Sequence, residues 1–261
     1  MASQRDPLSG SLRAGELAPL VLLAEQALRT WTPTWSAFLD GGLLEEAEAR
    51  LAALQELSIG SSGGHAAAER RRLVFQHSGA ALPVAELDGD FAGLEIAGNF
   101  LFDPADPADF SDALEAAGAR PQSCGDLWIR GDRGAQAIVD SALAASLDGR
   151  EGLVRSVTVR YQARPISELQ PPPPRLPRSL STVEASCRLD AVASAGFGLS
   201  RSRMVALIRQ GAVRVDWLPV NRASRELAVG ERVQLQGRGE LRIESVEPTR
   251  RERYRIRMER R

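Results

Sequence analysis

Arginine, serine and glutamine side chains that could bind phosphate are grouped between positions 188 and 222 of the chain. A guanidinium group can donate two parallel hydrogen bonds to a phosphate, and hydroxyl and amide groups can add single ones. The candidate residues are Arg188, Ser200, Arg201, Ser202, Arg203, Arg209, Gln210, Arg214 and Arg222. This composition indicates binding to a phosphate backbone, although a charged helix face can also be no more than a solvated surface.

Two short helices and a strand must position these side chains. Leu189, Val192 and Ala195 recur at helical spacing and Phe197 follows them, which predicts one buried stripe on a first helix. Gly198 is expected to end that helix, because glycine favours the position just after a helix.

The second helix is predicted to begin after Ser200, a good N-cap residue, and to stop at Gly211. Met204, Leu207 and Ile208 form its apolar face. The polar residues at 202 and 209, and those at 203 and 210, lie seven positions apart in each pair, so they fall on the opposite face. The Val-Arg-Val run at 213–215 predicts a strand that carries the arginine at 214.

Taken together, these positions resemble the S4 RNA-binding domain. The positions that match its signature are Arg188-Leu189-Asp190, Ser200-Arg201-Ser202, Ile208, Gly211, Val213 and Val215. The resemblance implies that this segment binds RNA. One departure is that many S4 domains have Asn-Gly after the second valine, where this chain has Asp216-Trp217. Because an acidic Asp216 would repel phosphate, it is not expected to contact RNA.

The net charge of −1 hides a strong division along the chain. Residues 1–174 hold 14 Arg and 24 Asp or Glu, a charge of −10, whereas residues 175–261 hold 19 Arg and 10 Asp or Glu, a charge of +9. A basic end on a nearly neutral protein predicts that this end binds a polyanion. All 33 basic residues are arginine, so a P-loop, which needs a lysine, is excluded.

Cysteine and histidine give no sign of a metal site. Cys124 and Cys187 stand 63 positions apart without a C-x-x-C pair, and His65 and His77 lack metal-ligand spacing. We therefore expect reduced thiols, a cytoplasmic location, no cofactor and no metal. The apolar run at residues 17–24 is too short to cross a membrane and lacks the layout of a signal peptide, so no membrane segment is expected.

An α+β fold with four segments is expected. Residues 1–80 form an N-terminal helical region, with helical periodicity from Leu17 to about Ser58, a flexible loop at 60–64 and a strand at 73–75. Residues 169–179 form a proline-rich linker, and residues 180–261 form the S4-like domain. In that last domain, strands are expected at 232–236 and 241–245 around a turn at Gly237-Arg238-Gly239.

Residues 81–168 are expected to form an RRM-like or ferredoxin-like α/β domain. Strands are predicted at 91–96, 126–129 and 154–161, and helices at 109–117 and 135–147. This alternation suggests a β-α-β-β-α-β layer. The domain lacks the aromatic motif of an RNA-binding RRM, so its residues do not support RNA binding.

Two further arginine groups are possible secondary RNA contacts. The residues are Arg70, Arg71, Arg72, Arg253, Arg255 and Arg257. The first three could instead pair with the acidic N-terminal helices. The last three alternate with Tyr254, Ile256 and Met258, which predicts a final strand with one buried face and one cationic face.

Motifs outside the S4-like segment indicate a more specific family than the S4 domain alone. Phe38-Leu39-Asp40, Gly63-Gly64-His65, Ala68-Glu69-Arg70 and Gly125-Asp126-Leu127 occur in this order before the C-terminal segment. The chain thereby resembles the YlmH family, also called photosystem II S4 domain proteins. His65 stands where an aromatic residue is usual. The resemblance implies a non-catalytic protein that binds rRNA, and possibly tRNA, on the large ribosomal subunit and takes part in the rescue of obstructed subunits.

Two other functions stay open from the sequence. The first is an RNA-modifying enzyme, because pseudouridine synthases carry a catalytic aspartate in an Arg-Leu-Asp motif, here Arg188-Leu189-Asp190. Only 71 residues follow Asp190, however, and the S4-like fold accounts for them, so Asp190 is interpreted as a residue of the first helical turn. The second is a scaffold or photosystem-related protein whose acidic half binds a basic partner.

Overall fold

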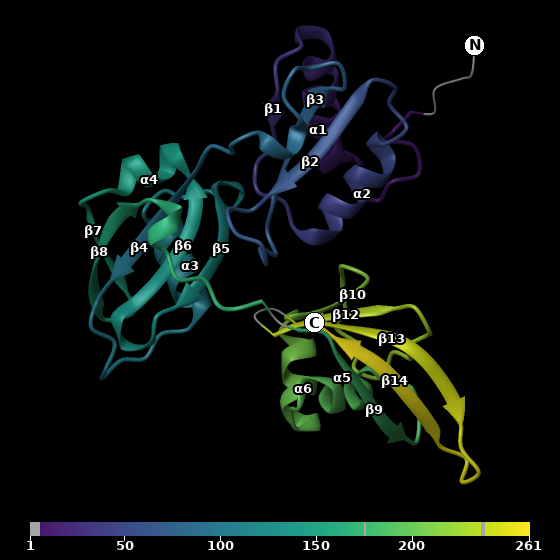
Figure 1. Cartoon of the computed structure of the whole chain (residues 1–261). Helices are drawn as coiled ribbons and strands as arrows, with labels where there is room; N and C mark the ends of the chain where they lie inside the picture. Colours follow the sequence, from purple (N-terminus) through teal and green to yellow (C-terminus); the bar gives the residue numbers. More distant parts are fainter. Residues whose placement is uncertain (1–5, 175, 236–237) are drawn as a thin grey trace. The chain divides into compact units, whose positions relative to one another are not determined.

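The computed structural model describes residues 6–174, 176–235 and 238–261, which form two compact units, one up to Pro173 and one from Pro174 onward (Figure 1). Helices and antiparallel sheets occur in both units, which confirms the α+β class. The division into four segments stays a prediction. Arg175 of the predicted linker, and Gln236 and Gly237 of the predicted strand and turn, lie outside the described residues.

The N-terminal part of the first unit is a small sheet packed against two helices. The helices are α1 (Ala14–Thr30) and α2 (Gly41–Leu51). The strands, in sheet order, are β1 (Thr34–Trp35), β3 (Arg72–His77) and β2 (Leu57–Ser62). Leu17, Leu20, Leu73 and Phe75 are almost completely buried between the helices and the sheet.

The sequence prediction was wrong for parts of this region. Residues 31–40 and 52–58 are not helical, and the predicted loop is a strand as far as Ser62. Gly60-Ser61-Ser62 has low intrinsic strand propensity, but it pairs along its length with β3, whose four central residues are buried. Tertiary pairing therefore decides the conformation of β2.

The remainder of the first unit is a five-stranded antiparallel sheet with helices on one face. The strands, in sheet order, are β5 (Cys124–Ile129), β6 (Gly134–Asp140), β4 (Phe91–Ala97), β8 (Val157–Arg164) and β7 (Glu151–Val154). The helices are α3 (Pro107–Ala116) and α4 (Ser141–Leu147). Short 3-10 helices lie at Val84–Glu86, Pro121–Ser123, Gly131–Arg133 and Ile166–Glu168. The chain order β4-α3-β5-β6-α4-β8 and the sheet order β5-β6-β4-β8 are those of a ferredoxin-like fold.

Two elements of this domain differ from the prediction. The helix predicted over Ala135–Leu147 is a strand, β6, as far as Asp140. Ala135, Ala137 and Val139 pack in the core under the helices, and Ile138 packs on the other face with Phe38 and Leu169. A strand buried on both faces has no polar alternation, which is why its residues resembled a helix. The single strand predicted at 154–161 is a hairpin of β7 and β8.

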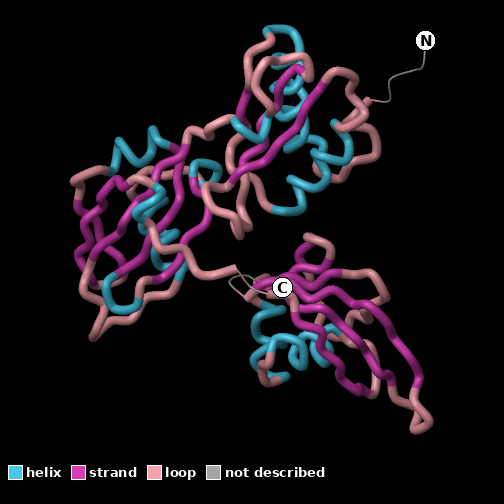
Figure 2. The backbone as a smooth tube through the Cα atoms, in the orientation of Figure 1, coloured by secondary structure: helices cyan, strands magenta, loops and turns pink. Residues whose placement is uncertain are grey.

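The second unit is one antiparallel sheet with two helices on one face (Figure 2). Its strands, in sheet order, are β11 (Leu218–Pro219), β10 (Val213–Val215), β12 (Arg232–Leu235), β13 (Gly239–Pro248), β14 (Tyr254–Arg260) and β9 (Arg178–Glu184). The helices are α5 (Leu189–Phe197) and α6 (Arg201–Arg209). Their apolar side chains form one core with the inner face of the sheet.

The predicted boundaries of the two helices are confirmed. Gly198 ends α5 in the left-handed conformation with φ of 67°, and the Ser200 side chain accepts a hydrogen bond from the Arg203 N–H at the start of α6. The buried stripe of α5 is shifted, since Ala195 is exposed and Ala193 is buried instead. Similarly, Tyr254 is 40% exposed, so the buried face of β14 contains only Ile256 and Met258 of the three residues predicted for it.

Candidate nucleic-acid interface

A buried carboxylate joins the two helices of the second unit at their N-terminal ends. Asp190 accepts hydrogen bonds from Arg188 Nε and Nη2, both at 3.0 Å, and from Arg201 Nε and Nη2 at 3.1 and 3.3 Å. The Asp190 side chain is only 4% exposed, whereas the side chains of Arg188 and Arg201 are 39% and 56% exposed. Asp190 thus holds two predicted phosphate ligands in place and neutralises part of their charge.

Electrostatics keep this carboxylate ionised. Burial alone would raise the pKa of Asp190, but the hydrogen bonds from Arg188 and Arg201 and their positive charges outweigh it, so the pKa lies below its ordinary value. The predicted place of Asp190 in the first turn of the helix is confirmed. Its two arginine partners were not predicted, and one of them is eleven positions away on the next helix.

Arg222 lies in a loop that packs against the same end of α5. The N–H groups of Leu189 and Asp190, which a helix cannot satisfy internally, donate to the carbonyls of Arg225 and Ala223 at 2.7 and 3.1 Å. Arg222 is exposed, and its Nε contacts Ser224 Oγ at 3.3 Å. The loop therefore brings Arg222 to the end of α5 that carries Arg188.

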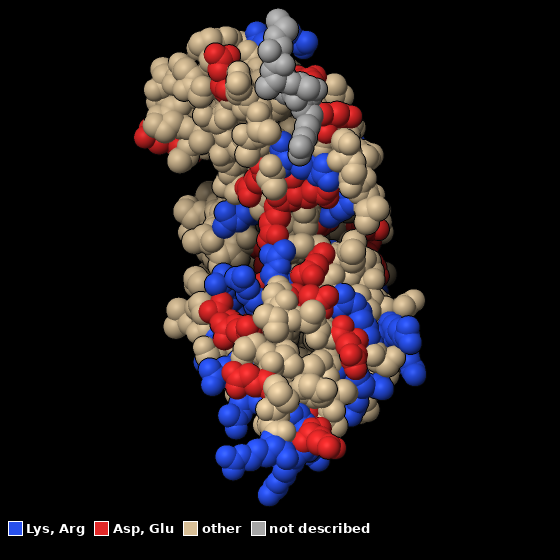
Figure 3. Space-filling model, turned by 90° about the vertical axis from the view of Figure 1, so that its right-hand side faces the viewer, with Lys and Arg blue, Asp and Glu red and all other residues tan. Residues whose placement is uncertain are grey.

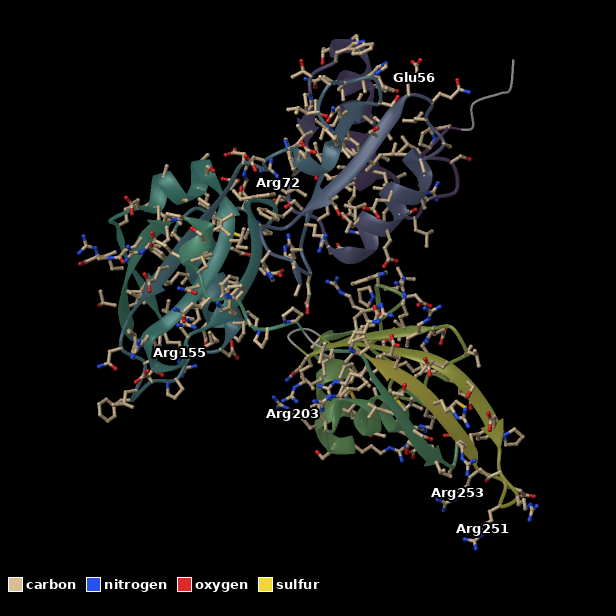
Figure 4. All side chains as sticks on the ribbon, in the orientation of Figure 1. Glu56, Arg72, Arg155, Arg203, Arg251 and Arg253 are labelled. Carbon is tan, nitrogen blue, oxygen red and sulfur yellow. The ribbon has the colours of Figure 1, made fainter. Side chains whose placement is uncertain are left out.

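The exposed face of α6 carries the other helical candidates. Ser202, Arg203, Arg209 and Gln210 are all exposed, and Arg203 projects from the helix on the side away from the sheet (Figure 4). The Ser200 and Ser202 hydroxyls lie 3.2 Å apart in the first turn. Among residues 6–174, 176–235 and 238–261, neither Arg203 nor Arg209 has an acidic partner. Their charge is available to a ligand.

Arg214 lies on the other side of the sheet. Val213 and Val215 are buried in the core that contains the helices, and side chains alternate along a strand. The exposed Arg214 therefore points from the sheet face that the helices do not cover. The structure does not bring it together with Arg203 and Arg209 into one surface.

The arginines of β14 share that uncovered sheet face with acidic neighbours. Arg255 and Arg257 are exposed, but Arg255 lies opposite Glu247, and Glu259 follows on the same strand. Arg253 belongs to the turn before the strand, and it projects with Arg251 from the end of the β13–β14 hairpin (Figure 4). In the view of Figure 3, blue and red side chains lie side by side over the lower part of the molecule. Residue types on one strand did not reveal this mixture of charge.

The arginines at 70–72 donate hydrogen bonds to backbone carbonyls of the first unit. Arg70 donates to the carbonyls of Cys124, Phe38 and Pro121, at 2.9, 3.3 and 2.9 Å. Arg71 donates to the carbonyls of Ala68 and Ala66. These contacts are with backbone oxygens. Arg71 also interacts with an acidic helix: burial raises the pKa of the Glu48 carboxyl on α2, and the positive charge of Arg71 opposes that rise. RNA contact by the three arginines stays a prediction.

Arg72 is also turned inward (Figure 4). It donates to the carbonyls of Ser36 and Asp90 and lies within 6 Å of the ring centres of Trp35, Phe38 and Phe91. Burial lowers the pKa of its guanidinium below the ordinary value. We therefore leave the three arginines out of the interface that we propose.

The motif residues of the first unit form a joint between its helical part and its ferredoxin-like part. The carboxylate of Asp126 accepts hydrogen bonds from the N–H groups of Glu69 and Arg70 at 2.8 and 2.9 Å, and it contacts His65 Nε2 at 3.1 Å. Gly63 fits here because a Cβ would lie 2.5 Å from the Arg70 carbonyl oxygen. The spacing of these motifs in the sequence did not predict that they join the helical part to the ferredoxin-like part.

The described part of the chain gives little support for a metal site, a membrane-spanning helix or a reactive cysteine. No group of three or more His, Cys, Asp or Glu side chains there could hold a metal ion, and no helix there is long and apolar enough to cross a membrane. Both cysteines are free. Burial raises the pKa of the Cys124 thiol to about 11, so this thiol is not an activated nucleophile.

Comparisons with known proteins match both ends of the chain. Residues 15–80 match the family model described as YlmH, N-terminal, and residues 187–233 match the S4 domain. The chain is 25% identical over 206 residues to the ribosome-associated protein quality control protein P2 of Bacillus subtilis (strain 168), covering 78% of this chain and 79% of the relative. Among solved structures, the cell division protein ylmH from Streptococcus pneumoniae gives a TM-score of 0.45 at 15% identity, over 60% of this chain and 94% of the other.

Proposed function

Because this chain is a YlmH-type protein with a C-terminal S4 domain, we propose that it is a non-catalytic RNA-binding protein that associates with the ribosome. The similarity to a ribosome-associated quality control protein supports this role. At a finer level we propose that it binds rRNA on the large ribosomal subunit, contacts tRNA there, and acts in rescue of stalled subunits. The proposal places the protein in the cytoplasm, with the ribosomes.

The exposed arginine face of α6 carries this proposal. Arg203 and Arg209 have no acidic partner among the described residues, and Arg188 and Arg201 are fixed next to the start of the same helix by Asp190. Two guanidinium groups that Asp190 holds in place, together with those of Arg203 and Arg209 on the exposed side of α6, suit phosphate oxygens that are spaced along an RNA backbone. Arg222 adds a cation at the end of α5.

The contacts of Asp190 favour a binding role over catalysis. A general base or nucleophile must present a lone pair to its substrate. Both Asp190 oxygens already accept two guanidinium hydrogen bonds each, and the carboxylate is buried. This geometry supports Asp190 as a positioning residue for Arg188 and Arg201.

The test is sedimentation of the tagged full-length protein in a cell lysate, at low and at high salt. The variant Arg203→Glu/Arg209→Glu is compared with Arg29→Glu/Arg133→Glu, which changes the net charge equally at two exposed positions of the first unit. We expect the wild type and the control to migrate with the large ribosomal subunit at low salt only. The α6 variant should stay at the top of the gradient.

The salt dependence gives a second measure. Each phosphate contact adds about 0.7–0.9 to the slope of log affinity against log salt concentration, so loss of two contacts should lower the slope for purified large subunits by about 1.5. Equal affinity and slope in the wild type and the α6 variant would remove this surface from the proposal. Wild-type protein that never migrates with ribosomes would refute the ribosomal role itself.

A further inference from the structure

The turn between β10 and β11 has a backbone conformation that is unfavourable for one of its two central residues, a tryptophan. Asp216 and Trp217 are its two central residues, and their φ angles are 46° and 67°. Two successive positive φ angles define a type I′ hairpin turn, which favours Asn or Asp first and glycine second. Asp216 fits this preference, because its side chain accepts a hydrogen bond from the Arg232 N–H at 2.9 Å. Trp217 occupies the position that glycine would stabilise best.

The surroundings of Trp217 are cationic. The guanidinium carbon of Arg232 lies 5.6 Å from the centre of the Trp217 ring, over one of its faces. Arg232 lies directly opposite Arg242 on β13, and Arg214 lies on the same uncovered side of the sheet, on the strand that leads into the turn. Like charges directly opposite each other in a sheet repel, so this arrangement favours anions beside them. Asp216 beside Arg232 and Glu259 opposite Arg242 balance part of this charge, and Arg214 adds a third cation.

The acidic groups nearby are engaged by the protein. Asp216 accepts a hydrogen bond from the Arg232 N–H and lies 3.9 Å from Arg232 Nε, and Glu240 accepts a hydrogen bond from Gln234 Nε2 at 3.0 Å. Glu259, which lies opposite Arg242 on β14, accepts a hydrogen bond from Arg261 Nε. Gln234 in turn accepts from the Trp217 N–H at 3.2 Å, which fixes the turn against the sheet. The partly exposed indole and the 52% exposed Leu218 beside it are therefore presented on a rigid support.

We propose that Trp217 is a stacking platform for a base of single-stranded RNA, with Arg214, Arg232 and Arg242 binding the flanking phosphates. An aromatic ring among guanidinium groups is the arrangement that recognises unpaired nucleotides, because every base has a face that can stack. A strained backbone conformation persists where it serves the site that it builds. This inference rests on the proposed RNA-binding function, and it adds a second contact surface on the sheet face opposite the helices.

The experiment compares two probes of about ten nucleotides, an oligouridylate and an abasic strand of the same length. Binding of full-length protein is measured by anisotropy for the wild type, Trp217→Gly, Trp217→Phe and Arg203→Glu/Arg209→Glu. We expect the wild type and Trp217→Phe to prefer the base-bearing strand by about tenfold. Trp217→Gly should lose this preference without a fall in its melting temperature, because glycine relieves the turn.

The α6 variant separates this inference from the proposed function. It should bind both strands more weakly by a similar factor, so that the preference for bases is retained. A wild type that does not discriminate between the two strands, or a Trp217→Gly variant that still does, overturns the stacking proposal. Loss of ribosome binding in the α6 variant would support the proposed function in either case.

Trp217 also offers a direct signal, since it is the only tryptophan from Pro174 onward. The other three are Trp31, Trp35 and Trp128. Addition of oligouridylate should quench the intrinsic fluorescence of the wild type, and the abasic strand should quench it much less. The same titration of Trp217→Phe should show no quenching although it binds equally well. Equal quenching in both proteins would contradict a base on this ring.

Discussion

At the scale of residues, Asp190 decides where two of the candidate RNA ligands lie. Replacement by Asn removes the charge that Arg188 and Arg201 share, and hydrogen bonds to charged groups contribute about 1.5–3 kcal/mol each when buried. Because both arginines are more than a third exposed, we expect Asp190→Asn to lower the free energy of unfolding by only about 2 kcal/mol at neutral pH. Urea unfolding of the full chain measures this change.

The pH dependence of stability follows from the lowered pKa of Asp190. In the unfolded chain the group has its ordinary pKa, so its stabilising contribution is complete above that value and is lost as the pH falls through the folded value. The difference in melting temperature between wild type and Asp190→Asn should thus shrink on acidification below about pH 4. Glu244→Gln, at an exposed position of the same unit, should show no such convergence. A constant difference down to low pH would refute the linkage.

Individual residues also show what the sequence could not reveal. Ser200 and Gly198 were predictable because capping is a local property of a few neighbouring residues. The carbonyl contacts of Arg70 and Arg72 were not, since their partners come from other parts of the unit. An arginine that binds backbone and an arginine that binds RNA are identical in a sequence. Only their surroundings distinguish them.

At the scale of elements, the packing of α5 on its sheet depends on Gly196. A Cβ at this position would lie 2.4 Å from Leu241 Cδ1 and 2.8 Å from Met258 Sδ, both of which belong to buried side chains. We expect Gly196→Ala to lower the free energy of unfolding by about 1–3 kcal/mol, because the helix must move away from β13. The matched control is Gly15→Ala in α1, where a Cβ meets nothing within 4 Å.

In that control the better helix propensity of alanine should leave the protein as stable or slightly more stable. Calorimetry of both variants measures the two effects, and a stabilised Gly196→Ala would mean that α5 can shift without cost. The prediction of elements from sequence succeeded for α5 and α6, whose ends are marked by local signals at Gly198 and Ser200. It failed for β6, because a strand buried on both faces lacks the alternation that identifies strands.

At the scale of the whole molecule, charge and fold divide along the same line. The acidic residues belong mostly to the first unit and the surplus arginines to the second, which contains the S4 match. The sequence predicted this division because net charge is a sum over residues and needs no coordinates. It did not predict that Arg203 and Arg214 lie on opposite sides of one sheet, since that depends on how β10 packs.

We expect the joint at Asp126 to make the two parts of the first unit unfold together. Its carboxylate accepts hydrogen bonds from two backbone N–H groups and contacts His65, so Asp126→Ala removes the acceptor of the exposed Glu69 N–H and the partly buried Arg70 N–H. We expect a loss of about 2–4 kcal/mol in the coupling of the two parts, which should separate one calorimetric transition into two and expose the segment at 60–71 to protease. Asp132→Ala, an exposed substitution in the same domain, should keep one transition. If Asp126→Ala also keeps one, the motif residues do not link the two parts, and their role must be sought in binding.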